Sequence, residues 1–338
     1  MKIIVDAFGG DHAPLEAIKG SQMATEQYGI SVILAGDEMI IREVAKKNGI
    51  SLENIEIVNA QTVIPIEEDP TEILKKYNDS SMAVGLKLLS DGKGDAFVSA
   101  GSTGALVVGS TLIVKRMKGV KRAALTGVIP NEKGGYMLLD IGANIECRPE
   151  MLVQFAIMGS AYMDKILGRK NPTVGLVNIG SEETKGLDLQ VQAHGLLKKA
   201  PVNFVGNVEP RYLPSGSVDV AVTDGFTGNI ILKLTEGLGS TISRQIKGIF
   251  LKNVITKIGA LFVYKGINDF KKSMDYTELG GAPLLGISKP VIKAHGSSNA
   301  KAFKNAIRQA KNFVENKVIE EIAETLLQLK ESNAMNQD

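Results

Sequence analysis

Cysteine, tryptophan and histidine are scarce in this chain of 338 residues, which contains one cysteine, no tryptophan and three histidines. The single cysteine, Cys147, excludes an intramolecular disulfide and a cysteine-rich metal centre. With one cysteine and three histidines we expect no transition-metal site, and although clustered Asp residues could hold Mg²⁺, no required metal is indicated. A lone cysteine also fits a reducing compartment, so the expected location is the cytoplasm.

Charge of one sign and long apolar runs are lacking as well. The chain has 39 Lys+Arg against 37 Asp+Glu, a formal net charge of +2. This balance lacks the basic excess of proteins that bind nucleic-acid backbone over their whole surface, so we expect no nucleic-acid partner. Asp6 interrupts the first apolar run too early for a signal peptide, and no window holds 18 apolar residues, so neither secretion nor a membrane span is expected.

The glycine fingerprints of nucleotide-binding proteins are also missing. Gly237-Leu238-Gly239 is followed by Ile242 where a Gly-x-Gly-x-x-Gly motif needs its third glycine, and there is no Gly-x4-Gly-Lys-Ser/Thr. We therefore expect no nucleotide and no other cofactor. Glycine itself is plentiful at 36 residues, and many of these glycines lie where predicted strands end.

Short apolar runs rich in β-branched residues recur along the chain, and nearly all of them stop at Gly, Asp, Asn or Ser before a helix-like stretch. This alternation is typical of βαβ proteins and predicts the α/β class. Several runs are apolar enough to be buried on both faces, as in a mostly parallel sheet covered by helices. The predicted strands are Lys2–Asp6, Ser31–Ala35, Ile55–Asn59, Ala96–Ser99, Ala123–Val128, Tyr136–Asp140, Val174–Asn178, Val202–Val205, Val218–Val222 and one near Val291–Lys293.

Amphipathic helices are predicted between the strands, among them Pro14–Tyr28, Glu38–Asn48 and Ser80–Ser90. A long helix is predicted from about Asn299 to Lys330, because apolar residues recur there at the spacing of one buried face. Residues 331–338 are expected to be a frayed tail. Since no Pro- or Ser-rich linker divides the chain, we expect one catalytic domain over residues 1–330.

One segment concentrates positive charge. Residues 237–268 contain five basic residues and no acidic one, and they predict a protruding helical segment at about residues 240–272. Such a segment suits a partner subunit, an anionic membrane surface or an acidic protein, and ordinary core or dimer packing is an equally weighted alternative. Its predicted apolar face is Leu251, Val254, Ile255, Ile258 and Phe262, with Lys252, Asn253, Thr256 and Lys257 on the other face and Lys265 beyond.

Six loops rich in glycine, hydroxyl and carboxylate groups follow predicted strands. In open parallel sheets, ligands bind beyond the carboxyl ends of the strands, so six such loops gathered at one edge favour a phosphate site. Two of the loops share a Gly-x-Thr-Gly turn, at residues 101–104 and 225–228, which helix capping alone also explains. The six loops are Asp6–His12, Ser99–Ala105, Asp140–Asn144, Asn178–Gly186, Asp224–Asn229 and His295–Asn299.

Two alternatives remain open from the residues alone. Residues 100–104 approach the Gly-x-Ser-x-Gly elbow of serine hydrolases, and Ser102, Asp224 and His295 follow in the order Ser, Asp, His. The first glycine of that elbow is missing, so chance order is a sufficient explanation. A non-enzymatic module that binds a carrier protein or a membrane is the other alternative.

Taken together, the six loops, the segment Leu139–Asn144 and the segment Gly281–Gly286 resemble the bacterial phosphate acyltransferase family of phospholipid synthesis, over essentially the whole chain. One local departure is Ser102, where we expect Asn. The resemblance implies a three-layer α/β/α fold similar to phosphotransacetylases and isocitrate-type dehydrogenases, in a homodimer. It implies transfer of a fatty acyl group from an acyl-carrier-protein thioester to inorganic phosphate, giving acyl phosphate.

The resemblance also implies a peripheral place at the inner face of the cell membrane, where the product feeds a membrane glycerol-3-phosphate acyltransferase. In this reaction phosphate is the nucleophile, so the protein needs an anion cradle and a polarised thioester carbonyl rather than an activated Ser or Cys. His12 or His295 is expected to protonate the leaving thiolate, with Asp6, Asp11, Asp140 or Asp224 orienting the imidazole. The expected phosphate and substrate residues are Gly9, Gly10, Ser99, Gly101, Ser102, Thr103, Gly104, Asn144, Asn178, Lys185, Thr227, Gly228, Asn229, Ser297, Ser298 and Asn299.

Overall fold

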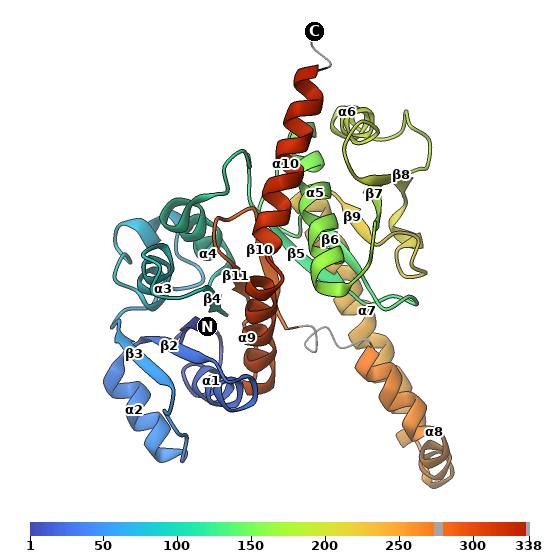
Figure 1. The fold of residues 1–338 in the computed structure, drawn as a ribbon. Helices are drawn as coiled ribbons and strands as arrows, with labels where there is room; N and C mark the ends of the chain where they lie inside the picture. Colours follow the sequence, from blue (N-terminus) through green and yellow to red (C-terminus); the bar gives the residue numbers. More distant parts are fainter. Residues whose placement is uncertain (274–279, 336–338) are drawn as a thin grey trace.

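A computed structural model describes residues 1–273 and 280–335 of the chain (Figure 1). Within these residues, eleven strands form one sheet in the order β3-β2-β1-β4-β11-β10-β5-β6-β9-β7-β8. The predicted α/β class with a mostly parallel sheet is confirmed. The strands are β1 (Lys2–Asp6), β2 (Ser31–Gly36), β3 (Ile55–Asn59), β4 (Ala96–Ser99), β5 (Ala124–Ile129), β6 (Tyr136–Leu139), β7 (Thr173–Val177), β8 (Asn203–Val208), β9 (Val220–Val222), β10 (Ala282–Leu285) and β11 (Val291–Lys293).

The strands fall into two parallel groups that run in opposite directions. The first strand group is β3-β2-β1-β4-β11 and the second strand group is β6-β9-β7-β8. Between them, β11 with β10, β10 with β5, and β5 with β6 are antiparallel pairs, so the direction reverses three times. The expectation that all six loops gather at one edge of the sheet is therefore wrong, because the carboxyl ends of the two groups point in opposite directions.

Helices cover both faces of the sheet, as a three-layer arrangement requires (Figure 1). Alternate residues of β1 serve the two faces: Ile3 and Val5 pack into one buried cluster with the helices α1, α5 and α9, whereas Ile4 packs into another with α3 and α4. The helices are α1 (Leu15–Tyr28), α2 (Glu38–Lys47), α3 (Ser81–Ser90), α4 (Thr103–Gly109), α5 (Pro149–Leu167), α6 (Asp188–Leu197), α7 (Gly225–Leu251), α8 (Val254–Ser273), α9 (Ala300–Glu315) and α10 (Val318–Met335), with short helical turns at Pro70–Leu74, Ser110–Lys115 and Pro210–Tyr212.

The predicted long helix at residues 299–330 is two helices. It breaks after Asn316, where Lys317 has a φ of 52°, a left-handed conformation that cannot continue an α-helix. The break lets α9 pack along α1 while α10 packs against α5, where Lys165 and Glu321 form an ion pair at 2.8 Å. The helix α10 continues to Met335, so residues 331–335 are helical rather than a frayed tail, and residues 336–338 lie outside the described residues.

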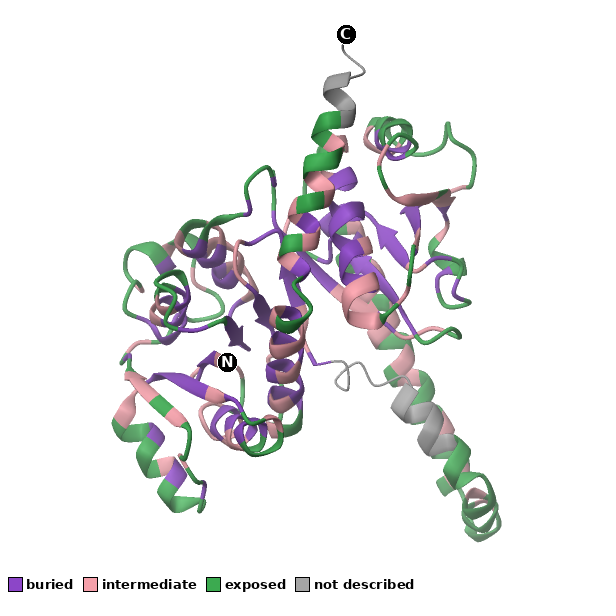
Figure 2. Ribbon diagram, viewed as in Figure 1, coloured by how far each residue is buried: buried purple, intermediate pink, exposed green. Residues whose placement is uncertain are grey.

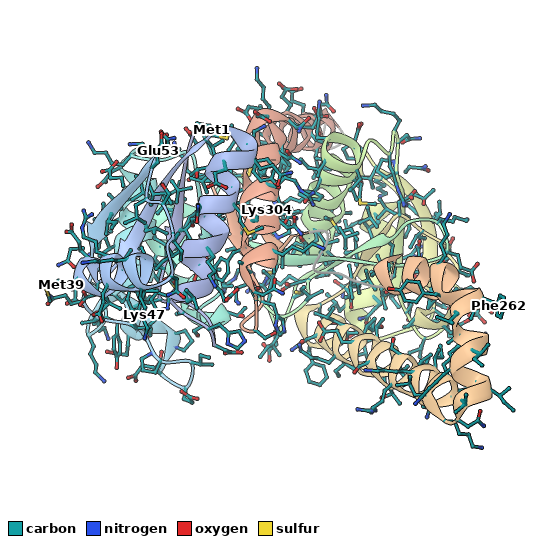
Figure 3. All side chains as sticks on the ribbon, turned by 90° about the horizontal axis from the view of Figure 1, so that it is seen from below. Met1, Met39, Lys47, Glu53, Phe262 and Lys304 are labelled. Atoms are coloured by element: carbon teal, nitrogen blue, oxygen red, sulfur yellow. The ribbon has the colours of Figure 1, made fainter. Side chains whose placement is uncertain are left out.

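The basic segment forms a hairpin of two helices that projects from the body of the molecule (Figure 1). In α7, whose 27 residues are all described, only Gly225 and Gly228 at its start are buried. Figure 2 shows the far part of the hairpin as largely exposed, and Phe262 on α8 lies at the opposite end of the molecule from Met39 on α2 (Figure 3). Among the described residues, α7 packs against the core through Ile231 and Leu232 near its start, so core packing does not account for the exposed apolar residues farther along the hairpin.

The predicted single helical face within that hairpin needs one correction. The chain turns at Lys252 and Asn253, so Leu251 ends α7 while Val254 begins α8. Asn253 and Thr256 cap the new helix reciprocally: the Thr256 N–H donates to Asn253 Oδ1 at 2.9 Å, and the Asn253 N–H donates to Thr256 Oγ1 at 3.0 Å. Lys252 therefore lies at the tip of the hairpin and not on the opposite face of one continuous helix.

Candidate active site

Three of the predicted loops meet at the carboxyl end of the first strand group. They are residues 6–12, 99–105 and 295–299, which follow the neighbouring strands β1, β4 and β11. The Asp11 N–H donates to the carbonyl of Gly296 at 2.8 Å, which ties the first loop to the third. A side chain on Gly9 would lie 2.6 Å from the backbone nitrogen of Gly101, so only glycine lets the first two loops approach this closely.

The carboxylate of Asp6 holds the first two loops together by hydrogen bonds. Its carboxylate is buried and accepts the Ser99 hydroxyl hydrogen at Oδ2, with a separation of 2.6 Å, and the Phe8 N–H at Oδ1. The Gly101 N–H in turn donates to Ser99 Oγ at 3.0 Å. Burial raises the pKa of Asp6 above its ordinary value, and these hydrogen bonds oppose that shift. Asp6 and Ser99 thus shape the loop backbone and are not exposed reactive groups.

Lys293 is a buried lysine of this group that the sequence analysis did not single out. Its ammonium donates to the carbonyl of Ala100 at 3.2 Å and also to that of Ala294, so it ties the second loop to the start of the third. Burial lowers the pKa of Lys293 to about 8, while the negative charges of Asp6 and Asp11 oppose the shift. Lysine is almost never buried without such partners. The one feature of the sequence that could have pointed to Lys293 is its position at the end of an otherwise apolar predicted strand.

A cavity of about 160 Å³ opens between these loops. One wall is polar and glycine-rich and includes Gly9, Gly10, Gly101 and Ser102. The other wall is the apolar segment of residues 63–66 with Phe8 and Met82. The cavity therefore places backbone groups and a hydroxyl beside apolar side chains, an arrangement suited to a small ligand with a polar end.

The remaining three predicted loops gather at the carboxyl end of the second strand group, around Asp140. Its fully buried carboxylate accepts hydrogen bonds from the N–H groups of Leu125, Gly142, Ala143 and Asn144 and from the Asn144 side-chain amide, at 2.6–3.2 Å. Burial raises the pKa of Asp140, and these donors oppose the shift. Asp140 and Asn144 were expected to act in proton transfer and substrate binding. Their hydrogen bonds show that they hold this loop in its conformation.

The start of α7 packs directly on this loop. The Gly225 N–H donates to the carbonyl of Asn144 at 2.7 Å, and a Cβ atom on Gly228 would lie 1.9 Å from the carbonyl oxygen of Asp140. The contact is between two backbones and leaves no space for a side chain. Gly228 is thus required by packing, which is a structural explanation for one of the predicted phosphate residues.

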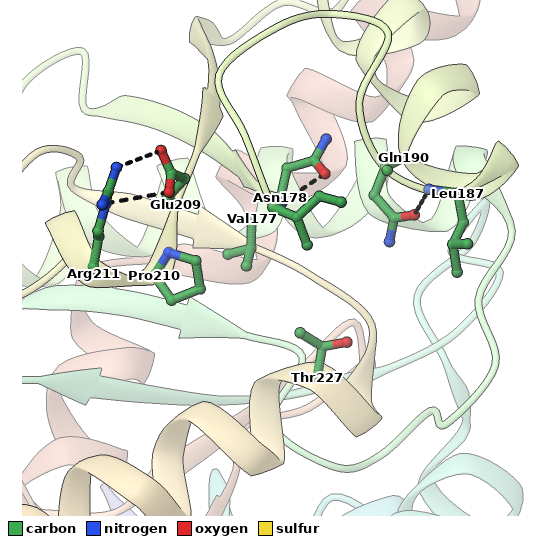
Figure 4. A pocket seen from close by; sticks show the side chains of 10 residues that line it. Val177, Asn178, Leu187, Gln190, Glu209, Pro210, Arg211 and Thr227 are labelled. Atoms are coloured by element: carbon green, nitrogen blue, oxygen red, sulfur yellow. Dashed lines mark hydrogen bonds and ion pairs between the residues drawn. The ribbon is translucent and has the colours of Figure 1, made fainter.

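A second cavity, of about 460 Å³, lies between the start of α7 and the loops that follow β7 and β8 (Figure 4). Of the predicted site residues, Asn178 and Thr227 line it. The Asn178 amide donates to the carbonyl of Lys185 at 2.9 Å and its oxygen accepts the Ile179 N–H, so this side chain clamps its own loop. Lys185 itself is exposed.

Several predicted site residues serve as helix caps. Ser102 Oγ accepts the Ala105 N–H at the start of α4, Asp224 accepts the Thr227 N–H and hydroxyl at the start of α7, and Asn299 caps α9. Ser102 and Asp224 follow strands of opposite direction, which does not support the Ser, Asp, His order as a hydrolase triad. Thr103 and Gly104 belong to α4, and Ser298 is buried beside the His295 carbonyl.

The exposed polar residues of the predicted site lie around the two loop groups. Asp11 and His12 are exposed in the first loop, and His295 is exposed with its Nδ1 2.8 Å from Ser297 Oγ. Asn229 is exposed on α7. Burial is the main cause of the lowered pKa of Lys293, and the positive charge of Lys233 on α7 adds to it.

Neither a metal centre nor a thiol nucleophile is indicated. No group of three or more His, Cys, Asp or Glu side chains that could hold a metal ion occurs in residues 1–273 and 280–335. Burial raises the pKa of Cys147 to about 12, and the charges of Asp140 and Asp224 add to the shift, so the thiol stays protonated.

The fold defined by these two strand groups is that of the phosphotransacetylases. A phosphotransacetylase from Streptococcus pyogenes superposes with a TM-score of 0.65 and 19% sequence identity, covering 95% of this chain and 94% of that chain. A branched-chain phosphotransacylase from Enterococcus faecalis superposes with a TM-score of 0.55 and 14% identity, covering 93% and 99%. The expected similarity to the phosphotransacetylase fold is confirmed.

Sequence relatives narrow this class to one family. A family model described as "Fatty acid synthesis protein" matches residues 1–321. A phosphate acyltransferase from Alkaliphilus oremlandii is 51% identical over 324 residues, which cover 96% of this chain and 97% of that protein. The chain belongs to the phosphate acyltransferase family, as the resemblance implied, and it is an acyltransferase enzyme.

Lys293 makes the free energy of unfolding depend on pH in a predictable window. Its pKa is about 8 when folded against 10.5 for an ordinary lysine, so the unfolded chain binds more protons between those values and stability rises with pH there. We expect wild type to gain about 2 kcal/mol relative to Lys293→Met between pH 7.5 and 9.5, measured by urea unfolding. A difference that is constant over this range, as expected for the exposed control Lys47→Met, would contradict the assignment.

Proposed function

We propose that this enzyme transfers a fatty acyl group from an acyl-carrier-protein thioester to inorganic phosphate, and that the acyl phosphate supplies phospholipid synthesis. The observation that carries the proposal is the match to phosphate acyltransferases over nearly the whole chain, together with a family model described as "Fatty acid synthesis protein". The match extends over nearly the whole chain, so it includes the residues of both loop groups. The likeness to distant solved structures, in contrast, concerns the fold alone.

In the proposed reaction an oxygen atom of phosphate attacks the carbonyl carbon of the thioester. The carbon–sulfur bond breaks, the acyl group stays on phosphate, and the carrier leaves as a thiolate that takes up one proton. The protein contributes a cradle for the anion and a proton donor rather than a nucleophile. His12 and His295 are the proposed donors, because both are exposed on loops of the first group.

The proposed phosphate cradle is the polar wall of the smaller cavity, with Gly9, Gly10, Gly101 and Ser102. Glycine at these positions lets an anion approach backbone N–H groups closely. The ammonium of Lys293 lies directly behind that wall, on the Ala100 carbonyl, and gives the cradle a positive charge that partly balances Asp6 and Asp11.

The helical hairpin is the proposed contact with the membrane surface or the acidic carrier. No helix among the described residues is long and apolar enough to cross a bilayer. The apolar side chains of the hairpin are nevertheless exposed, with Ile255 at 81% and Phe262 at 87%. Lys252 and Lys257 lie beside them at the tip and start of α8. Exposed apolar groups next to basic ones are typical of surfaces that bind anionic lipid.

A homodimer is the proposed assembly, and α7 supplies the observation that supports it. Large apolar side chains recur at every fourth position of its exposed face, from Phe226 through Ile230, Leu234 and Leu238 to Ile242, and each is about half exposed. A row of this kind along one helix is unfavourable in water unless another surface covers it.

A turnover assay tests the proposed reaction. Purified enzyme with acyl-carrier-protein thioester is expected to release the carrier thiol only when phosphate is present, because phosphate is the nucleophile, and phosphorus NMR should detect the acyl phosphate. Sodium sulfate at the same ionic strength is the control and should release no carrier thiol. Release of free fatty acid without phosphate, with covalent labelling of Ser102, would instead establish the hydrolase.

Charge reversal tests the proposed role of the hairpin. The variant Lys252→Glu/Lys257→Glu is expected to bind phosphatidylglycerol vesicles at least about tenfold more weakly in sedimentation, because each basic residue near such a surface contributes about 1 kcal/mol. Lys46→Glu/Lys47→Glu on α2, two exposed lysines at the other end of the molecule, is the matched control and should bind as wild type does. Vesicle binding that the hairpin variant leaves unchanged would refute membrane docking.

A further inference from the structure

The larger cavity combines apolar walls with polar side chains that each have a partner within the protein. It is lined by residues from three places: the end of β7 with the loop into α6, the turn after β8, and the start of α7 (Figure 4). Its apolar walls come from Val177, Ile179, Leu187 and Pro210. Its volume of about 460 Å³ is nearly three times the 160 Å³ of the glycine-lined cavity.

Each polar side chain that lines this cavity has a bonding partner in the protein. Arg211 and Glu209 form a two-point ion pair, with both nitrogen–oxygen distances at 3.2 Å (Figure 4). The Gln190 oxygen accepts the Leu187 N–H at 3.1 Å, and Asn178 clamps its own loop at both ends.

The same holds for Thr227 at the end of the cavity next to α7. Its hydroxyl donates to Asp224 Oδ2 at 2.8 Å. An anion at Arg211 would have to share the guanidinium with Glu209, whose carboxylate already accepts from Nε and Nη2 and neutralises its charge. The paired groups therefore disfavour phosphate here and favour a ligand without charge.

Two side chains that line the cavity are unusually exposed for their type. Ile179 is 80% exposed and Leu187 is 77% exposed, although both belong to loops of the body of the molecule and not to the hairpin. Contact between these side chains and an apolar ligand would remove apolar surface from water on both partners, which favours binding.

From these observations we infer that this cavity holds the hydrocarbon chain of the acyl donor, with Ile179 and Leu187 as the side chains that favour long chains. The inference rests on the proposed acyl transfer. It assigns phosphate and acyl chain to different places: phosphate to the glycine-lined loops of the first strand group, and the chain to the apolar cavity of the second. The start of α7 adjoins the cavity, and Lys233 on the same helix acts electrostatically on Lys293 in the first group.

Chain-length preference is the readout that tests the inference. The rate constant kcat/KM is measured with donors that carry an eight-carbon and a sixteen-carbon acyl group, for wild type and for Ile179→Ser and Leu187→Ser. Both variants are expected to lower the long-to-short ratio by about tenfold or more, because each methylene that loses its contact costs at least that much in a fitted pocket. Met39→Ser, a similarly exposed apolar residue at 76% on α2, is the matched control and should keep the wild-type ratio.

The outcomes separate the inference from the proposed function. Variants that form acyl phosphate with the wild-type ratio would overturn the inference alone. An equal loss with both donors, or a change in molecular mass by light scattering, would also overturn it, because Ile179 and Leu187 would then contact the carrier protein or a second copy of the chain. Wild-type enzyme that forms no acyl phosphate with either donor would overturn the proposed function, and the inference with it.

Discussion

The hydrogen bonds of the Asp140 carboxylate are the constraint on which the second loop group depends. A buried carboxylate is tolerated only when donors satisfy it, and here backbone N–H groups of the following loop do so. The carbonyl of the same residue then forms the floor on which Gly228 packs, so the loop and the start of α7 have fixed relative positions. Asp6 plays the corresponding part for the first group, through Ser99 and Gly101.

This arrangement relates the fold to the chemistry. The sheet reverses direction in the middle, so each strand group presents its own set of loops, one rich in glycine and hydroxyl groups and the other with apolar walls. An acyl transfer to phosphate joins a small anion to a long apolar chain, and two chemically different loop groups suit that pair of substrates. The helix α7 begins in the second loop group and ends at the tip of the exposed hairpin.

Much of the fold could be predicted because local patterns determine it. The predicted strands Lys2–Asp6, Ile55–Asn59 and Ala96–Ser99 have their observed bounds, since each is a β-rich run ended by a loop residue. The reversal of the sheet could not be predicted, because it depends on β10, a strand of four residues that contains Pro283 and that no alternation marks. The loops were recognised by composition, but sequence alone did not distinguish structural groups such as Asp140 and Asn178 from groups available to a substrate. Lys293 was missed because burial is a property of the folded chain.

The measurement that tests this account most directly is the stability of a Gly228→Ala variant compared with Gly237→Ala. Both glycines lie in α7, but a Cβ atom on Gly228 would overlap the Asp140 carbonyl, whereas one on Gly237 meets nothing within 4 Å. Urea unfolding is predicted to show a loss of at least about 2 kcal/mol for Gly228→Ala and a change of no more than about 1 kcal/mol, in the stabilising direction, for Gly237→Ala. A Gly228→Ala protein as stable as wild type would contradict the account, because the Asp140 loop would then not fix the start of α7.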